Sequence, residues 1–148
     1  MRGRGPPLIL FNHSGASARG WHEAFLDALA LDRTLLLPDH RGTGQSQDGT
    51  APYSLAVLAL DGLAALDDVE IEVADVMGIS MGGAVAQELA LSAPKRVRRL
   101  VLAATFCGQR RRPQLSTLGG LYTDENSWSA KASSPRPCSR ESGGPRLL

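Results

Sequence analysis

Residues 73–83 decide how this sequence is interpreted: Val73-Ala74-Asp75-Val76-Met77-Gly78-Ile79-Ser80-Met81-Gly82-Gly83. The apolar run 73–77 is typical of a buried strand, and the alanine-rich run 83–91 predicts a helix. Between them lies a G-x-S-x-G pentapeptide (78–82), a pattern that gains meaning only where it joins a strand to a helix. Both neighbours have the expected type, so we predict a strand–turn–helix unit with Ser80 at the turn.

The residue types in this turn suit a nucleophilic serine. Such a serine must project from a sharp, strained turn, and glycines on both sides let strand and helix backbones pass closely. The helix that follows the turn points N–H groups and the positive end of its dipole toward the site. The Met81 N–H could then donate to the oxyanion of an attacked carbonyl. The simpler alternative is a glycine-rich turn in which Ser80 only caps the helix.

Working outward, strand and helix patterns alternate along most of the chain. Apolar runs predict further strands at 8–11, 34–37 and 97–103. Helical spacing predicts helices at 21–31 and at 54–66, the second with Ser54 as its N-cap, and Ala93-Pro94 should end the helix after the turn. Alternation of this kind predicts the α/β class, with about four parallel strands and helices on both faces.

Two loops after these strands carry further motifs. The strand at 8–11 leads into Asn12, Ser14, Gly15 and Trp21, and the next strand leads into Asp39-His40-Arg41-Gly42-Thr43-Gly44-Gln45-Ser46, a D-x-R-G-x-G-x-S pattern. We interpret the second loop as structural. Its glycines permit a tight turn, and charge-assisted hydrogen bonds from Asp39 and Arg41 could hold it in place.

In this order and spacing, the three motifs resemble the α/β-hydrolase superfamily, over residues 5–108. The resemblance implies a serine hydrolase acting on a small-molecule carboxylic ester or lactone, with no metal or organic cofactor. Ser80 would be the nucleophile, and the N–H groups of Met81 and Ser14 would form the oxyanion hole. Many members carry His-Gly where this sequence has Asn12-His13, and its Asn-x-x-Gly loop resembles the 3-oxoadipate enol-lactonase branch.

The resemblance leaves the catalytic base without a counterpart. The triad of this fold runs Ser, acid, His along the chain, whereas His13, His22 and His40 all precede Ser80. Losing the base costs a serine hydrolase on the order of a million-fold in turnover, so we expect this chain to be nearly inactive as written. The alternative function is a non-catalytic remnant or binding protein.

Other possibilities are disfavoured or left open by the sequence. A nucleotide-binding domain is disfavoured because no G-x-G-x-x-G follows the first strand and no phosphate loop is present. No family motif surrounds the downstream acids Asp124 and Glu125, so neither is nominated as the catalytic acid. His13 and His22 are interpreted as loop or surface residues, since neither has an evident acid partner.

Composition agrees with an ordinary globular protein. The chain has 148 residues, 43% apolar and 21% charged, and its net charge of +1 gives no reason to expect a nucleic-acid partner. Two cysteines, Cys107 and Cys138, are too few for a disulfide framework, and the apolar run at 8–11 is too short for a signal peptide or a membrane span. We therefore expect a cytoplasmic protein; its oligomeric state stays open.

The C-terminal part differs from the rest. Residues 127–148 include six Ser, three Pro and three Arg without strand or helix periodicity, so we expect this stretch to be disordered. We interpret residues 5–108 as a partial hydrolase core, truncated at both ends, and residues 109–148 as a degenerate tail. A frameshift would produce such a tail.

Overall fold

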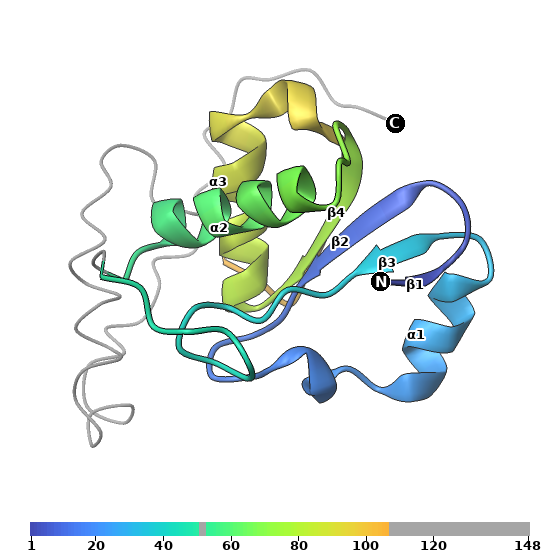
Figure 1. The fold of residues 1–148 in the computed structure, drawn as a ribbon, viewed down its shortest axis with the longest axis horizontal. Helices are drawn as coiled ribbons and strands as arrows, with labels where there is room; N and C mark the ends of the chain where they lie inside the picture. The colour runs from blue at the N-terminus through green and yellow to red at the C-terminus, as the bar shows by residue number, and fades with distance from the viewer. Residues whose placement is uncertain (51–52, 107–148) are drawn as a thin grey trace, which may run out of the picture.

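A computed structural model describes residues 1–50 and 53–106 of the chain. Within these residues, five strands form one sheet in the order β1-β3-β2-β4-β5 (Figure 1). They are β1 (Arg2–Gly3), β2 (Pro7–Phe11), β3 (Thr34–Leu36), β4 (Ala74–Ile79) and β5 (Val97–Ala103). Strands β2 to β5 pair in parallel, whereas β1 pairs antiparallel with β3.

Helices cover both faces of the sheet. Figure 1 shows α1 (Glu23–Ala30) on one face and α2 (Leu55–Asp68) with α3 (Met81–Ser92) on the other. Two short 3₁₀ turns, Ala18–Gly20 and Pro94–Arg96, precede α1 and β5. The predicted α/β class and the four parallel strands are confirmed.

The differences from the prediction lie at the ends of elements. β1 was not predicted, because two residues carry no periodicity and only their pairing with Thr34 and Leu35 makes them a strand. The N-cap at Ser54 is confirmed, since its hydroxyl accepts the Val57 N–H at 3.2 Å. α3 begins at Met81, two residues before the predicted start. The predicted tail, 109–148, lies outside the described residues, with Asp124, Glu125 and both cysteines.

β2 shows why a central strand consists of an uninterrupted apolar run. Ile9 and Phe11 are buried against α2 and α3, and Leu8 and Leu10 are buried in the cluster that includes Leu26 of α1. Successive side chains of a strand point to opposite faces, so a strand covered on both faces must be apolar at every position.

β5 has a different environment. Among the described residues it pairs with β4 alone, and its side chains Leu100, Val101 and Leu102 are 39%, 49% and 42% exposed. Within the described part of the chain, β5 is therefore an exposed edge of the sheet. Unpaired edges of this kind are prone to association with other strands.

An ion pair joins β4 to β5 on the other side of the sheet from α3. Asp75 on β4 is only 5% exposed, and its two carboxylate oxygens accept from Arg98 Nε and Nη2 at 2.8 and 2.7 Å. Arg33 lies further away, with its Nε 3.8 Å from the same carboxylate. The hydrogen bonds from Arg98 lower the pKa of Asp75 below its ordinary 3.8.

We expect Asp75→Asn to remove an acid-sensitive part of the stability. A carboxylate whose pKa is lower in the folded state stabilises the fold above its unfolded pKa, and this contribution is lost as the pH falls through the folded value. The parent should therefore lose stability below about pH 4, while Asp75→Asn is less stable at neutral pH and flatter on the acid side. Urea midpoints measured from neutral to acid pH check this. Asp32→Asn, at a mostly exposed carboxylate, is the control and should follow the parent.

Candidate active site

Ser80 lies between the end of β4 and the start of α3, in a backbone conformation that L-residues rarely adopt. Its φ of 54° and ψ of −121° lie in the positive-φ region, as expected for a strained turn. The Ser80 N–H donates to the Ala103 carbonyl of β5 at 3.0 Å. The Ser80 carbonyl accepts from the Gly83 N–H at 3.0 Å and from the Thr105 hydroxyl at 2.6 Å. These bonds hold the strained residue from both sides of the turn.

The glycines around Ser80 are required by close packing. A Cβ on Gly78 would lie 2.1 Å from the Gly82 carbonyl oxygen, and one on Gly83 would lie 2.5 Å from Thr105 Cβ. A Cβ on Gly82 would lie 2.2 Å from the Phe11 carbonyl oxygen, at the end of β2. All three distances are shorter than any van der Waals contact. The glycines therefore bring the β4–α3 turn against β2 and against the segment after β5.

The loop after β2 starts from a buried residue. Asn12 is 4% exposed; its Nδ2 donates to the Ser17 carbonyl at 2.8 Å, and its Oδ1 accepts the His13 N–H at 2.8 Å. Ser14, the predicted oxyanion donor, is half-buried in the turn that these bonds close. Since Gly82 packs against the carbonyls of Phe11 and Asn12, the base of this loop lies at the N-terminus of α3.

The D-x-R-G-x-G-x-S loop is fixed as predicted. Asp39 accepts from the Ala18 N–H at 2.5 Å and from the Gln45 N–H at 2.9 Å. Arg41 binds Asp61 of α2 with two hydrogen bonds, of 2.7 and 2.6 Å. These are charge-assisted contacts, so both residues hold the loop to neighbouring elements. A Cβ on Gly44 would lie 2.0 Å from Asp39 Oδ2, which explains a glycine there.

The three histidines are engaged elsewhere. His13 is exposed, with its ring Nδ1 3.0 Å from the Ser14 carbonyl, and His22 is the exposed N-cap residue of α1. His40 is 4% exposed and stacks on Phe11, with ring centroids 6.0 Å apart. Sequence reasoning placed His40 in a structural loop but missed its burial and its contact with the loop after β2. The available signal was its place between Asp39 and Arg41, two anchoring residues.

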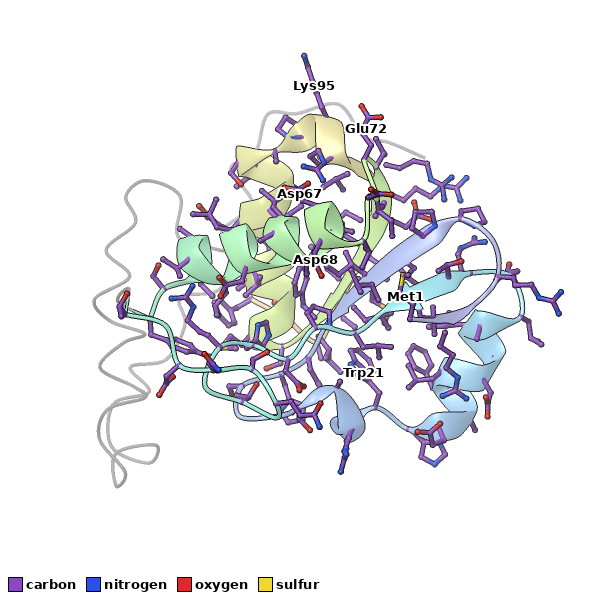
Figure 2. The ribbon with its side chains drawn as sticks, in the orientation of Figure 1. Met1, Trp21, Asp67, Asp68, Glu72 and Lys95 are labelled. Atoms are coloured by element: carbon purple, nitrogen blue, oxygen red, sulfur yellow. The ribbon has the colours of Figure 1, made fainter. Side chains whose placement is uncertain are left out.

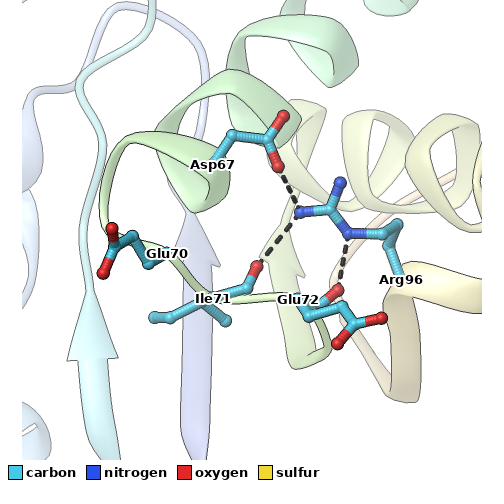
Figure 3. Close-up of a pocket in the computed structure, with 5 residues that line it drawn as sticks. All are labelled: Asp67, Glu70, Ile71, Glu72 and Arg96. Carbon is cyan, nitrogen blue, oxygen red and sulfur yellow. Dashed lines mark hydrogen bonds and ion pairs between the residues drawn. The ribbon is translucent and has the colours of Figure 1, made fainter.

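The opposite end of β4 holds a pocket of another kind. Figure 2 shows Asp67, Glu72 and Lys95 at the end where β4 begins, whereas Ser80 follows its other end. The pocket is lined by Asp67, Glu70, Ile71, Glu72 and Arg96. Figure 3 shows that Arg96 spans it: the guanidinium donates to Asp67 and to the Ile71 and Glu72 carbonyls at 2.5, 3.0 and 2.5 Å. Arg96 thereby fixes the end of α2 to the start of β4, a structural role.

The described residues contain neither a metal-binding cluster nor a membrane-spanning helix. Over residues 1–50 and 53–106, no group of three or more His, Cys, Asp or Glu side chains is arranged to hold a metal ion. No helix in that same part of the chain is long and apolar enough to cross a membrane.

Comparison with known proteins agrees with this geometry. The family model for the alpha/beta hydrolase fold matches residues 6–128. Rhodomycin D methylesterase DauP of Streptomyces sp. (strain C5) is 38% identical over 100 residues, which are 65% of this chain and 34% of that protein. A hydrolase of Pseudomonas aeruginosa PA01 is 43% identical with a TM-score of 0.66, covering 72% of this chain and 41% of its own.

An enol-lactonase is also among the similar solved structures. The enzyme from Burkholderia xenovorans LB400 is 32% identical with a TM-score of 0.65, covering 70% of this chain and 39% of its own. This TM-score is nearly equal to that of the Pseudomonas aeruginosa hydrolase, so the likeness extends across the superfamily and does not single out one branch.

The chain therefore belongs to the α/β-hydrolase fold family. It spans 34 to 41% of the length of the curated relatives that it matches.

Proposed function

We propose that Ser80 is the nucleophile of a site that hydrolyses a small carboxylic ester or lactone through an acyl-enzyme. In this proposal, the N–H groups of Met81 and Ser14 donate to the oxyanion of the tetrahedral intermediate. The observation that supports it best is the strained backbone of Ser80 at the junction of β4 and α3. Strain of that size persists only where the surrounding structure imposes it, and it concentrates at functional sites.

The surroundings of Ser80 support the same chemistry. Met81 is the first residue of α3, where helix N–H groups and the positive end of the dipole favour negative charge. Gly82 packs on the carbonyl oxygens of Phe11 and Asn12, which brings the loop of Ser14 to the same helix end. A serine nucleophile flanked by two backbone donors is the arrangement that acyl transfer requires.

The general base is the part of the proposal that this sequence does not supply. The rings of His13 and His40 contact backbone carbonyls, of Ser14 and Asn12, and His22 lies at the start of α1. We therefore propose that the chain by itself is nearly inactive. Because no histidine of the sequence is engaged with Ser80, a second candidate function is a non-catalytic protein that binds ligands or partners.

A fluorophosphonate probe separates the two candidates. We expect it to label Ser80 about a hundredfold faster than the other serines, since one oxyanion donor alone contributes about 10²–10³ in rate. Peptide mass spectrometry of the labelled protein gives the site and the rate, and Ser80→Ala should abolish the fast phase. A folded sample in which Ser80 labels no faster than an exposed serine such as Ser92 would favour the non-catalytic candidate.

A further inference from the structure

The carbonyl oxygen of Asn12 lies where three segments come together: the β4–α3 turn that holds Ser80, the loop after β2, and the D-x-R-G-x-G-x-S loop. On one side is Gly82 of α3, whose Cβ, if present, would lie 2.5 Å from this oxygen. On another side is the ring of His40, with Nε2 3.2 Å from it. Asn12 and His40 are each only 4% exposed, so this contact is shielded from water.

The direction of this hydrogen bond follows from its acceptor. A carbonyl oxygen has no proton to give, so the Nε2 of His40 must carry the proton and donate. Burial lowers the pKa of His40 below its ordinary 6.5, although the hydrogen bond to Asn12 and the charges of Asp61 and Asp39 act in the other sense, and the ring is therefore neutral at pH 7. His40 is then the Nε2–H tautomer, stacked flat on Phe11 with 11° between the ring planes.

Three successive residues of one loop are thereby anchored to three different elements. Asp39 accepts from Ala18 beyond the loop after β2, Arg41 binds Asp61 on α2, and His40 between them donates to Asn12 at the end of β2. Asp39 and Arg41 explain how the loop itself is held. Of the three, only His40 contacts Asn12, which lies two positions before Ser14 at the start of the loop after β2.

We infer that His40 is a positioning residue for the oxyanion hole: its Nε2–H fixes the Asn12 carbonyl against Gly82 and thereby sets the place of the Ser14 N–H relative to Ser80. This inference rests on the proposed function for the role of Ser14. It does not require the ring to touch substrate or to exchange a proton with Ser80. The buried side chain acts through the backbone of Asn12.

Amide hydrogen exchange of residues 13–16 tests the inference directly. His40→Leu keeps an apolar side chain but has no donor, and we expect exchange there to rise about tenfold, the equivalent of one buried hydrogen bond. His40→Gln retains a side-chain N–H donor and should remain within about threefold of the parent. Exchange at Val76 and Leu89, which are fully buried in the core, should stay unchanged in both variants.

Two outcomes of the exchange experiment would overturn the inference. One is unchanged exchange of residues 13–16 in His40→Leu; the other is an equal rise in the loop and the core, which would make His40 an ordinary core residue. His22→Leu, at an exposed histidine outside these contacts, is the matched control and should leave loop exchange unaltered.

A second measurement needs no substitution and remains decisive if His40→Leu does not fold. Ring nitrogen chemical shifts of the parent at pH 7 should show His40 as the Nε2–H tautomer, and the Nδ1–H tautomer would refute the bond to Asn12. Fluorophosphonate labelling of Ser80 in the same samples reports on the proposed function separately. Suppose that Ser80 is not labelled, while exchange of the loop rises in His40→Leu and returns toward the parent in His40→Gln. This result would reject the catalytic role of Ser80 and keep the positioning role of His40.

Discussion

Purified protein should hydrolyse p-nitrophenyl acetate on the order of a million-fold more slowly than a complete serine hydrolase, and added imidazole should accelerate the part of the reaction that depends on Ser80. The first expectation follows from the cost of a missing base. The second follows because free imidazole can take the serine proton that no histidine of this chain is placed to accept. A positioned base contributes about 10²–10⁴ in rate, so a diffusing one should give about tenfold.

Ser80→Ala is the matched control for this experiment, because imidazole also hydrolyses activated esters in solution. The rate in that variant is subtracted at each imidazole concentration, and what remains is the contribution of Ser80. Fast hydrolysis without imidazole that disappears in Ser80→Ala would mean that another group of the chain acts as base, against the expected inactivity. No imidazole effect in a folded sample would mean that Ser80 is not held as a nucleophile.

Gly82→Ala is expected to be strongly destabilising. The added Cβ would lie 2.2 Å from the Phe11 carbonyl oxygen and 2.5 Å from that of Asn12. Both are backbone atoms at the end of a central strand, so neither can rotate away, and overpacking there costs about 3 kcal/mol or more. Alanine's better helix propensity offsets about 1 kcal/mol of this. The net loss, about 2 kcal/mol, should lower the urea midpoint by about 1 M.

Gly15→Ala is the informative comparison. Gly15 has a φ of 70°, but a Cβ there would meet no atom within 4 Å. Its cost is therefore backbone strain alone, about 1 kcal/mol. If Gly82→Ala proved no more destabilising than Gly15→Ala, the close packing of α3 on β2 would not be the reason for a glycine at position 82.

Much of the fold could be predicted because local patterns and burial agree along this chain. The uninterrupted apolar run of β2 indicated a strand covered on both faces, and it is buried by α1 on one side and by α2 and α3 on the other. Ser54 was recognised as a helix cap from its residue type, and its hydroxyl makes the expected bond to Val57. β1 was missed because two residues contain no pattern and depend wholly on their partner strand.

The candidate site likewise has features that the sequence predicted and the structure shows, and residue roles that stay predictions. The motif around Ser80 indicated a strained turn, because glycines on both sides of a serine at a strand–helix junction permit the close backbone approach that such a turn needs, and its φ of 54° agrees. The ties of Asp39 and Arg41 were expected from their charges and are present. The nucleophilic role of Ser80 and the donor roles of Met81 and Ser14 remain predictions for the experiments above.

By itself, then, the sequence determined the class of fold, the strand–turn–helix unit at Ser80 and the absence of any histidine after it, since periodicity, glycine placement and residue counts are properties of the chain as written. Only the tertiary structure decided which distant segments meet: Gly82 against the end of β2, Thr105 on the Ser80 carbonyl, and His40 on the Asn12 carbonyl. Such contacts join residues 25 to 71 positions apart. They depend on how strands are ordered in the sheet, and no local pattern encodes that order.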